Sequence, residues 1–566
     1  MFYSDPMKLT KLCWLGLAED YTFSDRIGIS TMTKHWLSLR GEYGISVPLV
    51  ISLVLIVLML RHAISLFLIS FNKKTSMQRD PKTKVLRRRM TPIGKFALAS
   101  QTETNQSIIT FFIALSNKVG NKPMDLADFE SLWDTRIKSE KRHERFGCCV
   151  SEDVDGCFEK VDKPTCAYAS EYPHPQNIQE TKVRIEDFLT RPIDVYDKLW
   201  QMELSSGSLG TSGTILHSDE LKKKGRETET LALFRSHHCL CDGVSLSAVI
   251  ADLSNESKEL RNNMLCKVEA NKQRLFRTSF FARVLSLMIG SVSYYVLGTM
   301  VALSFQVWNM ISSSNPFDMH MKKDSGGTRS VAWTYLGSIE DAKQVTKSAK
   351  KDAKLNDLFV SCLTSAIERQ YEISRGNTSS DGFKSKRRPP TSVNVTVTTH
   401  LRGGIILPSE SIGNNVGAFV VTTPFKGKAG SSVNRLRAIS KTLKIMKRTP
   451  APQLSYLVSS FISNYLPERF AQSALAEANC HSVATISNVH GFTDKIHWDR
   501  NPVEMICAFL PCPETIPIGV VVTSYNHRII MSVNADADVV PDADAFLNWM
   551  VEEYETIKRE TTHEES

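Results

Sequence analysis

Residues 45–60, ISVPLVISLVLIVLML, carry no charge and form the most apolar stretch near the amino terminus. Counted from residue 43, the uncharged run has eighteen residues, close to the lower limit of about 17–25 for a membrane-spanning helix. An Arg-His pair interrupts it, and a second apolar run, AISLFLISF, follows. The pattern predicts a transmembrane and interfacial segment over 45–71. A buried core helix or a purely interfacial segment would give the same pattern.

A second uncharged stretch covers residues 284–311, VLSLMIGSVSYYVLGTMVALSFQVWNMI. It is long enough to span a bilayer, but five small or polar side chains dilute it: Gly290, Ser291, Ser293, Ser304 and Gln306. Such dilution, together with Tyr and Trp, suits a helix lying on or dipping into the membrane. A tightly packed interdomain helix is the alternative.

The remaining sequence alternates strand-like and helix-like patterns. Residues 231–234, LALF, form a short apolar run of the buried-strand type. Soon afterwards Leu246, Val249, Ile250 and Leu253 recur at the spacing of one helix face. The stretch 205–225 is rich in Ser and Gly and then in charge, which predicts a loop.

The second half shows the same mixture. Val393, Val395 and Val397 alternate with polar residues, as in a half-buried strand. Two apolar runs flank Asn526-His527, which predicts a β-hairpin. Residues 382–390, GFKSKRRPP, predict a loop. The fold class is therefore α/β, in six consecutive parts: a tail (1–44), the membrane segment (45–71), a linker (72–89), a first lobe (90–270), a hydrophobic linker (271–325) and a second lobe (326–560).

The net charge of +9 over 566 residues is small and partly localised. Eight Lys or Arg residues and one Asp lie within residues 73–89. Basic residues beside a spanning helix favour the cytosolic side and attract anionic headgroups, although a solvated linker would have the same composition. This distribution gives no support for a nucleic-acid-binding protein. The twelve cysteines are scattered without a CxxC pair, as expected for reduced thiols facing the cytosol.

The chemistry-bearing motif is His237-His238-Cys239-Leu240-Cys241-Asp242-Gly243, at the predicted junction of strand and helix. Histidine suits a general base because its ordinary pKa of about 6.5 leaves it neutral near neutral pH. Strand alternation points His237 and His238 to opposite faces. Asp242 can hold the loop by pairing with a buried Arg or by capping the helix. Gly243 permits a tight bend.

The same residues have plainer interpretations. A His-His pair is often structural, and Asp242 could be no more than an N-cap. Metal ligation is a further alternative, but ligands this close together on one strand rarely converge, so no metal is expected.

HHCLCDG resembles the HHxxxDG signature of an acyltransferase superfamily that includes chloramphenicol acetyltransferase and peptide-synthetase condensation domains. Further sequence stretches narrow the resemblance to the wax ester synthase/diacylglycerol acyltransferase family, and they occur in that family's order along residues 88–560. They are the stretches MTP (90–92), RPID (191–194), KLWQMEL (198–204), LND (355–357), LR (401–402), GNNVG (413–417), SNVHG (487–491), TSY (523–525) and AD (535–536). Two positions depart from the family pattern, because Lys198 and His490 stand where Pro is usual. The amino-terminal membrane segment suggests a eukaryotic type.

The resemblance implies two chloramphenicol-acetyltransferase-like lobes with a channel between them. It makes His238 the general base, His237 a supporting residue and Asp242 a structural one, with Gly243 keeping the approach open. Asn356 resembles a second polar residue directed at the site, with an N-cap role as the alternative. Arg402 is a candidate partner of Asp242, with a surface or interdomain ion pair as the alternative.

The expected activity is acyl transfer from acyl-CoA, a co-substrate, to a fatty alcohol or diacylglycerol, with no cofactor. A single crossing by residues 284–311 would separate the halves of one active site, so a membrane-surface position is preferred for that stretch. Membrane lipids are expected partners, at the endoplasmic reticulum with the catalytic body facing the cytosol, or at lipid droplets. The alternatives are an acyltransferase for a small alcohol or amine, and an inert lipid-binding relative.

Overall fold

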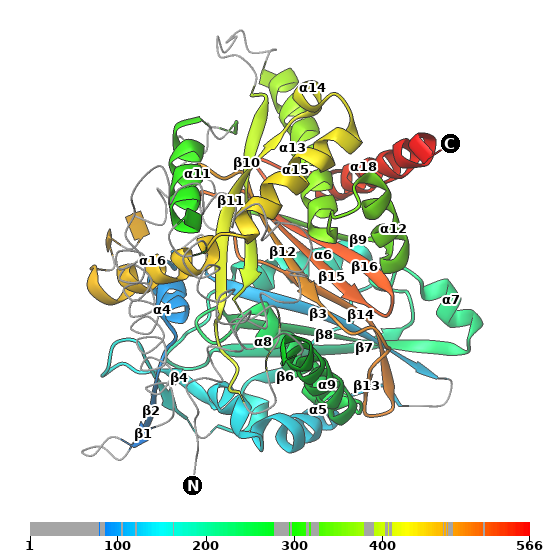
Figure 1. The fold of residues 1–566 in the computed structure, drawn as a ribbon. Coiled ribbons are helices and arrows are strands. Elements are labelled where there is room, and N and C mark those ends of the chain that lie inside the picture. Colours follow the sequence, from blue (N-terminus) through cyan, green and yellow to red (C-terminus); the bar gives the residue numbers. More distant parts are fainter. Residues whose placement is uncertain are drawn as a thin grey trace.

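The computed structural model describes residues 78–79 and most of residues 85–565 (Figure 1). The longer stretches outside the description are 1–77, 80–84, 277–293, 318–327 and 379–389, and shorter ones fall within 103–105, 119–121, 295–296, 313–315, 402–409, 468–478 and 513–514, and at 162 and 566. The described chain is α/β, as predicted.

One six-stranded sheet carries the motif. Its strands, in spatial order, are β13 (His497–Trp498), β14 (Asn501–Phe509), β3 (Ile108–Lys118), β8 (Arg226–His237), β7 (Trp200–Ser208) and β6 (Ala169–Glu171). All neighbours are antiparallel except β6 and β7. β8 reads LALFRSH at its end and is buried along this length, as the apolar run predicted.

The second six-stranded sheet belongs to the carboxy-terminal half. Its order is β11 (Val416–Pro424), β10 (Ser392–His400), β12 (Ala484–His490), β15 (Ile518–Tyr525), β16 (Arg528–Asp536) and β9 (Arg329–Ser338). β12 is parallel to β10 and to β15, and the other pairs are antiparallel. Four helices share a core with this sheet and lie beside it in Figure 1: α12 (Ile339–Ala349), α13 (Leu355–Thr378), α15 (Ser432–Lys447) and α18 (Ala543–Glu565).

One strand crosses between the halves. β14 comes from the carboxy-terminal half of the chain but pairs antiparallel with β3, with Cys507 opposite Phe112. Every residue of β14 is buried. The predicted division into 90–270 and 326–560 therefore differs from the structure, because residues 497–509 complete the first sheet. The order of the sequence suggested two consecutive lobes, whereas β14, which is mostly apolar and wholly buried, pairs with a strand of the other sheet.

The remaining elements pack against both sheets and against one another. The helices are α4 (Pro92–Ala99), α5 (Leu126–Trp133), α6 (Ile178–Thr190), α7 (Ser218–Lys223), α8 (Gly243–Leu253), α9 (Ser257–Phe276), α11 (Gly298–Ser312), α14 (Lys426–Ala429) and α16 (Ala451–Tyr465). Three short helical turns, η1 (Asp134–Lys138), η2 (Lys141–Gly147) and η3 (Thr165–Ala167), lie before α6. A small sheet has the order β1 (Gln78–Arg79), β2 (Leu86–Arg89), β5 (Cys157–Lys160) and β4 (Cys148–Val150).

Several local predictions are confirmed. Tyr525 and Arg528 are paired across the β15–β16 hairpin, and Asn526 and His527 have φ of 47° and 61°. Positive φ at both central residues is the geometry of a type I′ turn, which follows the twist of the strands. The buried face of α8 is also the predicted one, and the valines of β10 are buried.

Other predictions differ from the structure or lie outside it. Ser205–Ser208 belong to strand β7, and residues 218–223 form α7, so the predicted loop is shorter. Residues 45–71 and most of 382–390 lie outside the described residues. Among the helices that the structure does describe, none is both long enough and apolar enough to cross a membrane. The stretch 284–311 is described mainly as α11, which contacts α16 and β11.

Candidate active site

The motif occupies the end of β8 and the turn into α8. β8 ends at His237 and α8 begins at Gly243. Cys239, Leu240, Cys241 and Asp242 are fully buried, whereas His238 is partly exposed. A reagent from outside therefore reaches His238 before any other ionisable group of the motif.

His237 is held on both sides of its ring. The backbone N–H of Cys239 donates to Nδ1 at 3.1 Å, so the ring proton is on Nε2, which donates to Oε1 of Gln101 at 3.2 Å. The amide of Gln101 is itself oriented by its donation to Gln106. Burial, and secondarily the neighbouring His238, lower the pKa of His237 to about 3. This histidine is neutral and has no lone pair left for an outside proton.

His238 is fixed by two contacts from distant parts of the chain. Its backbone N–H donates to the carbonyl of Ser107 at 2.7 Å. Its ring Nδ1 lies 3.2 Å from Oδ1 of Asn414. Ser107 has a φ of 49°, a conformation that non-glycine residues seldom adopt, so the start of β3 is strained where it supports this residue.

The orientation of the Asn414 amide assigns the His238 tautomer. Its Nδ2 donates to the carbonyls of His238 at 2.7 Å and Cys239 at 3.2 Å, so Oδ1 has to face the ring. An amide oxygen only accepts, and Nδ1 of His238 therefore carries the proton. The lone pair is left on Nε2, which can accept a proton.

The pKa of His238 is lowered, mainly because burial disfavours the charged ring, while Asp242 and Asn414 act in the opposite direction. A lowered pKa keeps the imidazole neutral at physiological pH. The ring can accept a proton at Nε2, and Asp242 and Asn414 partly offset the cost of burying the resulting positive charge.

Asp242 joins the two halves of the chain. Its Oδ1 accepts from the N–H of Ser245 at 2.8 Å, which caps α8, and its Oδ2 accepts from the N–H of Asn415 at 2.8 Å. Nε2 of His400 is 3.8 Å from the same oxygen. The structure therefore shows capping. The suggested partner Arg402 lies outside the described residues.

Gly243 has no left-handed backbone, so the expected conformational need for glycine is absent. A Cβ atom there would lie 3.4 Å from Cγ2 of Val489 on β12. The beginning of α8 therefore lies against the end of a strand from the other half, at about the distance of an ordinary van der Waals contact.

Asn356 is the second residue of α13 and not its N-cap. The helix start is held instead by Asp357, whose Oδ2 accepts from the N–H of Lys354 at 3.0 Å. The Oδ1 atom of Asn356 accepts from Nδ2 of Asn488 at 2.5 Å. Asn356 therefore reaches the region of β12 that precedes Val489, through a second asparagine that sequence reasoning gave no role.

The most important residue that sequence reasoning missed is Asn414. The stretch GNNVG stood out as part of a family resemblance, but nothing local linked it to a histidine 176 positions earlier. Gln101 was missed for the same reason. For Asn414 the available signal was a pair of asparagines between two glycines, and that signal is weak.

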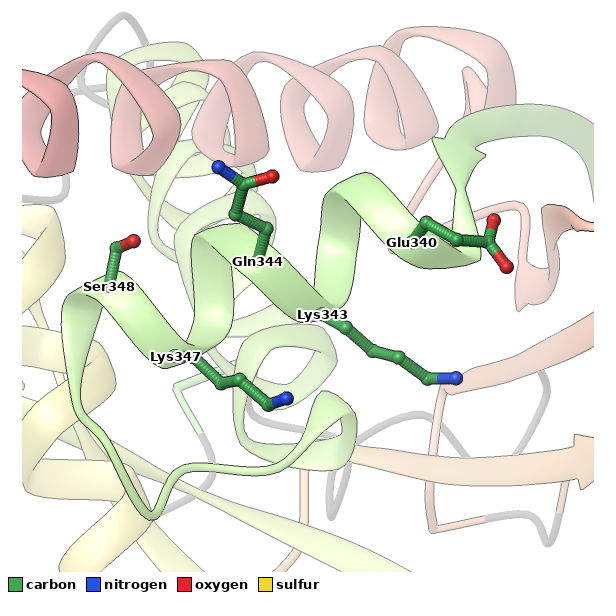
Figure 2. Close-up of a pocket in the computed structure, with 5 residues that line it drawn as sticks. All are labelled: Glu340, Lys343, Gln344, Lys347 and Ser348. Carbon is green, nitrogen blue, oxygen red and sulfur yellow. The ribbon is translucent and has the colours of Figure 1, made fainter.

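A surface depression on α12 has no part in this site. It is lined by Glu340, Lys343, Gln344, Lys347 and Ser348 (Figure 2). All five side chains come from one helix, and none belongs to the motif. Within the described residues, no cluster of three or more His, Cys, Asp or Glu side chains could hold a metal ion.

Comparisons with known proteins agree with this fold and with the family resemblance. Residues 412–558 match the model of the WS/DGAT C-terminal domain. The wax ester synthase/diacylglycerol acyltransferase 1 of Arabidopsis thaliana is 20% identical over 401 residues, which are 69% of this chain and 78% of that protein. The wax ester synthase/diacylglycerol acyltransferase 3 of the same plant is 22% identical over 404 residues, 68% of this chain and 77% of that protein.

Among solved structures, the trichothecene 15-O-acetyltransferase of Fusarium sporotrichioides has a TM-score of 0.54 at 12% identity, covering 86% of this chain and 98% of that one. This similarity concerns the fold. The sequence matches support the family that the motifs indicated: residues 412–558 match the C-terminal domain of the wax ester synthase/diacylglycerol acyltransferase family, and over two thirds of its length the chain is similar to acyltransferases of that family.

Proposed function

We propose that this protein transfers a fatty acyl group from acyl-CoA to the hydroxyl of a long-chain alcohol or of diacylglycerol, with His238 as the general base. The observation that carries the proposal is the fixed tautomer of His238, because Asn414 holds the proton on Nδ1 and leaves Nε2 free to accept one. His237 is the alternative base on sequence grounds, and its two occupied nitrogens argue against it.

The reaction then needs no covalent enzyme intermediate. Nε2 of His238 removes the hydroxyl proton as the alcohol oxygen attacks the thioester carbonyl carbon. The tetrahedral intermediate collapses, the C–S bond breaks, and the imidazolium returns its proton to the sulfur of coenzyme A. The products are an ester and the free thiol.

The two halves of the chain meet at this base. Asp242 caps α8 and accepts from Asn415 of the other half, so the position of His238 depends on how the halves pack. A channel for both substrates between the halves follows from the proposal. We further propose that the enzyme works at the endoplasmic reticulum membrane with its catalytic body in the cytosol, with the lipid droplet surface as the alternative.

A purified-enzyme assay separates the functional alternatives. Palmitoyl-CoA is supplied with hexadecanol, with diacylglycerol, or with a short soluble alcohol or amine, and the His238→Ala variant is the control. Ester formed from either lipid acceptor and lost in the variant supports the proposal. Turnover of the small acceptors alone would identify a different acyltransferase, and no turnover with any acceptor would identify an inert lipid-binding relative.

The location has its own test. Protease added to sealed microsomes should cut within residues 384–388 and leave the first 40 residues intact. Protection of both regions would contradict a cytosolic catalytic body.

A further inference from the structure

Helix α16 has a large exposed apolar face. None of its 15 residues is charged. Val458, Phe461 and Tyr465 are 56%, 58% and 68% exposed, and their i, i+3, i+7 spacing places them on one face. Phe470, shortly after the helix, is 64% exposed. Single exposed apolar residues are ordinary, whereas a contiguous stripe of large ones marks an interaction surface.

Helix α11 extends this face. It is also free of charge. Leu297, just before it, is 58% exposed, and Met300 and Leu303 within it are 63% and 56% exposed. The start of α11 packs against the start of α16, since a Cβ on Gly298 would lie 2.9 Å from Cδ of Pro450. Figure 1 shows α11 and α16 on the same flank of the molecule.

The same flank lies close to the residues that hold His238. The hydroxyl of Ser463 on α16 donates to the carbonyl of Pro92 at the start of α4. On α4, Gly94 packs so closely on the motif that a Cβ there would lie 2.6 Å from the carbonyl oxygen of Cys239 and 3.4 Å from Nδ2 of Asn414. One helix therefore separates the apolar stripe from the residues that hold His238.

Positive charge borders the stripe. Lys447 and the exposed Arg448 end α15 immediately before α16 begins. In the sequence the basic segment 73–89, with eight cations and one acid, precedes α4, and of its described residues Arg87 and Arg88 are ion-paired. An uncharged stripe of aliphatic and aromatic side chains with cations at its border matches a bilayer that contains anionic lipid.

We propose that the face formed by Leu297, Met300, Leu303, Val458, Phe461 and Tyr465, here called the α11–α16 face, rests on a phospholipid bilayer. It thereby brings α4 and the partly exposed His238 close to the membrane, so that a hydroxyl lipid reaches His238 without crossing water. The purpose of the surface rests on the proposed function, but its contact with lipid does not. The alternatives to a bilayer as the partner of this face are residues 45–71 of the same chain and a second copy of the protein.

The first experiment detects the occupant directly. The photoreactive residue benzoylphenylalanine replaces Phe461 in the full chain, and a matched variant carries it at Val183 on α6, which is 54% exposed. Both are irradiated on vesicles of phosphatidylcholine with a minor fraction of phosphatidylserine. Phospholipid adducts at 461 should exceed those at 183 by about tenfold, since an embedded side chain is surrounded by lipid. Equal yields, or adducts to residues 45–71 or to a second chain, overturn the proposal.

The second experiment links the face to acceptor use. The double variant Val458→Asp and Phe461→Asp should use vesicle-embedded diacylglycerol about tenfold more slowly and a short soluble alcohol at about the normal rate, because only the first must come from the bilayer. Val183→Asp is the matched control, and melting temperatures check the fold. Equal loss on both acceptors, or no loss on either, contradicts the proposed route. If the wild-type chain esterifies no acceptor but the probe at position 461 still cross-links to phospholipid, the proposed function is wrong and the proposed lipid contact is supported.

Discussion

Oδ1 of Asn414 lies 3.2 Å from Nδ1 of His238, although the two residues are 176 positions apart in the chain. The same amide donates to the carbonyls of His238 and Cys239. One side chain from the second half of the chain thus fixes the position, the ring orientation and the tautomer of the proposed base.

The two histidines should respond differently to removal. His238→Ala should lower the rate of ester formation by about 10²–10⁴, the usual contribution of a positioned base. His237→Ala should cost less, because His237 supports the turn through Cys239 and Gln101. Turnover by the purified variants measures both, with membrane attachment and expression as controls. A His238→Ala enzyme that keeps a third of its turnover would refute the assignment.

Asn414→Ala should lower kcat with little effect on KM for acyl-CoA. The lost hydrogen bonds are worth about 1–2 kcal/mol, which corresponds to about a 5–30-fold slower reaction. Asn415→Ala is the matched control, because the structure gives Asp242 only the backbone N–H of Asn415. Equal effects of the two alanines would mean that loop packing, and not the tautomer, is responsible.

The pH dependence should have its acid limb below the ordinary histidine range. Burial lowers the pKa of His238, so the base stays neutral as pH falls through about 6.5, and kcat/KM declines only at lower pH. The hydrogen bond from His238 to Asn414 raises that pKa, and Asn414→Ala should therefore move the limb to still lower pH. Initial rates across the acid range, with circular dichroism to exclude unfolding, measure this. A limb above 6.5 would contradict the sign.

Asp242→Asn should reduce stability and activity together. Both carboxylate oxygens accept from backbone N–H groups, of Ser245 and Asn415, and an amide can supply only one acceptor. The mismatch should cost about 1–3 kcal/mol. Thermal melting and turnover are measured on the same preparation. An unchanged melting temperature with complete loss of activity would point to a direct chemical role for Asp242.

Asn356 and Asn488 should act as one unit. Their side chains are 2.5 Å apart, so Asn356→Ala and Asn488→Ala should have similar effects on turnover, and the double variant should be little worse than either. Additive effects in this double-mutant cycle would show that each asparagine contacts substrate independently.

The sequence by itself determined the features that depend on near neighbours. Alternating valines predicted β10, the spacing from Leu246 to Leu253 predicted the buried face of α8, and Asn526-His527 predicted the hairpin turn. The motif and its ordered neighbours also indicated the family. Each of these signals lies within a few residues, where backbone sterics and side-chain periodicity act.

The tertiary structure alone decided what joins the two halves. The crossing of β14 to the first sheet, the contact of Asn414 with His238 and the bond from Asn415 to Asp242 all connect residues more than 170 positions apart. No local pattern encodes such pairs, because a buried polar group requires a partner but does not specify which one along the chain. The sequence therefore indicated the proposed base, and the packing of one half against the other determined its partner and its tautomer.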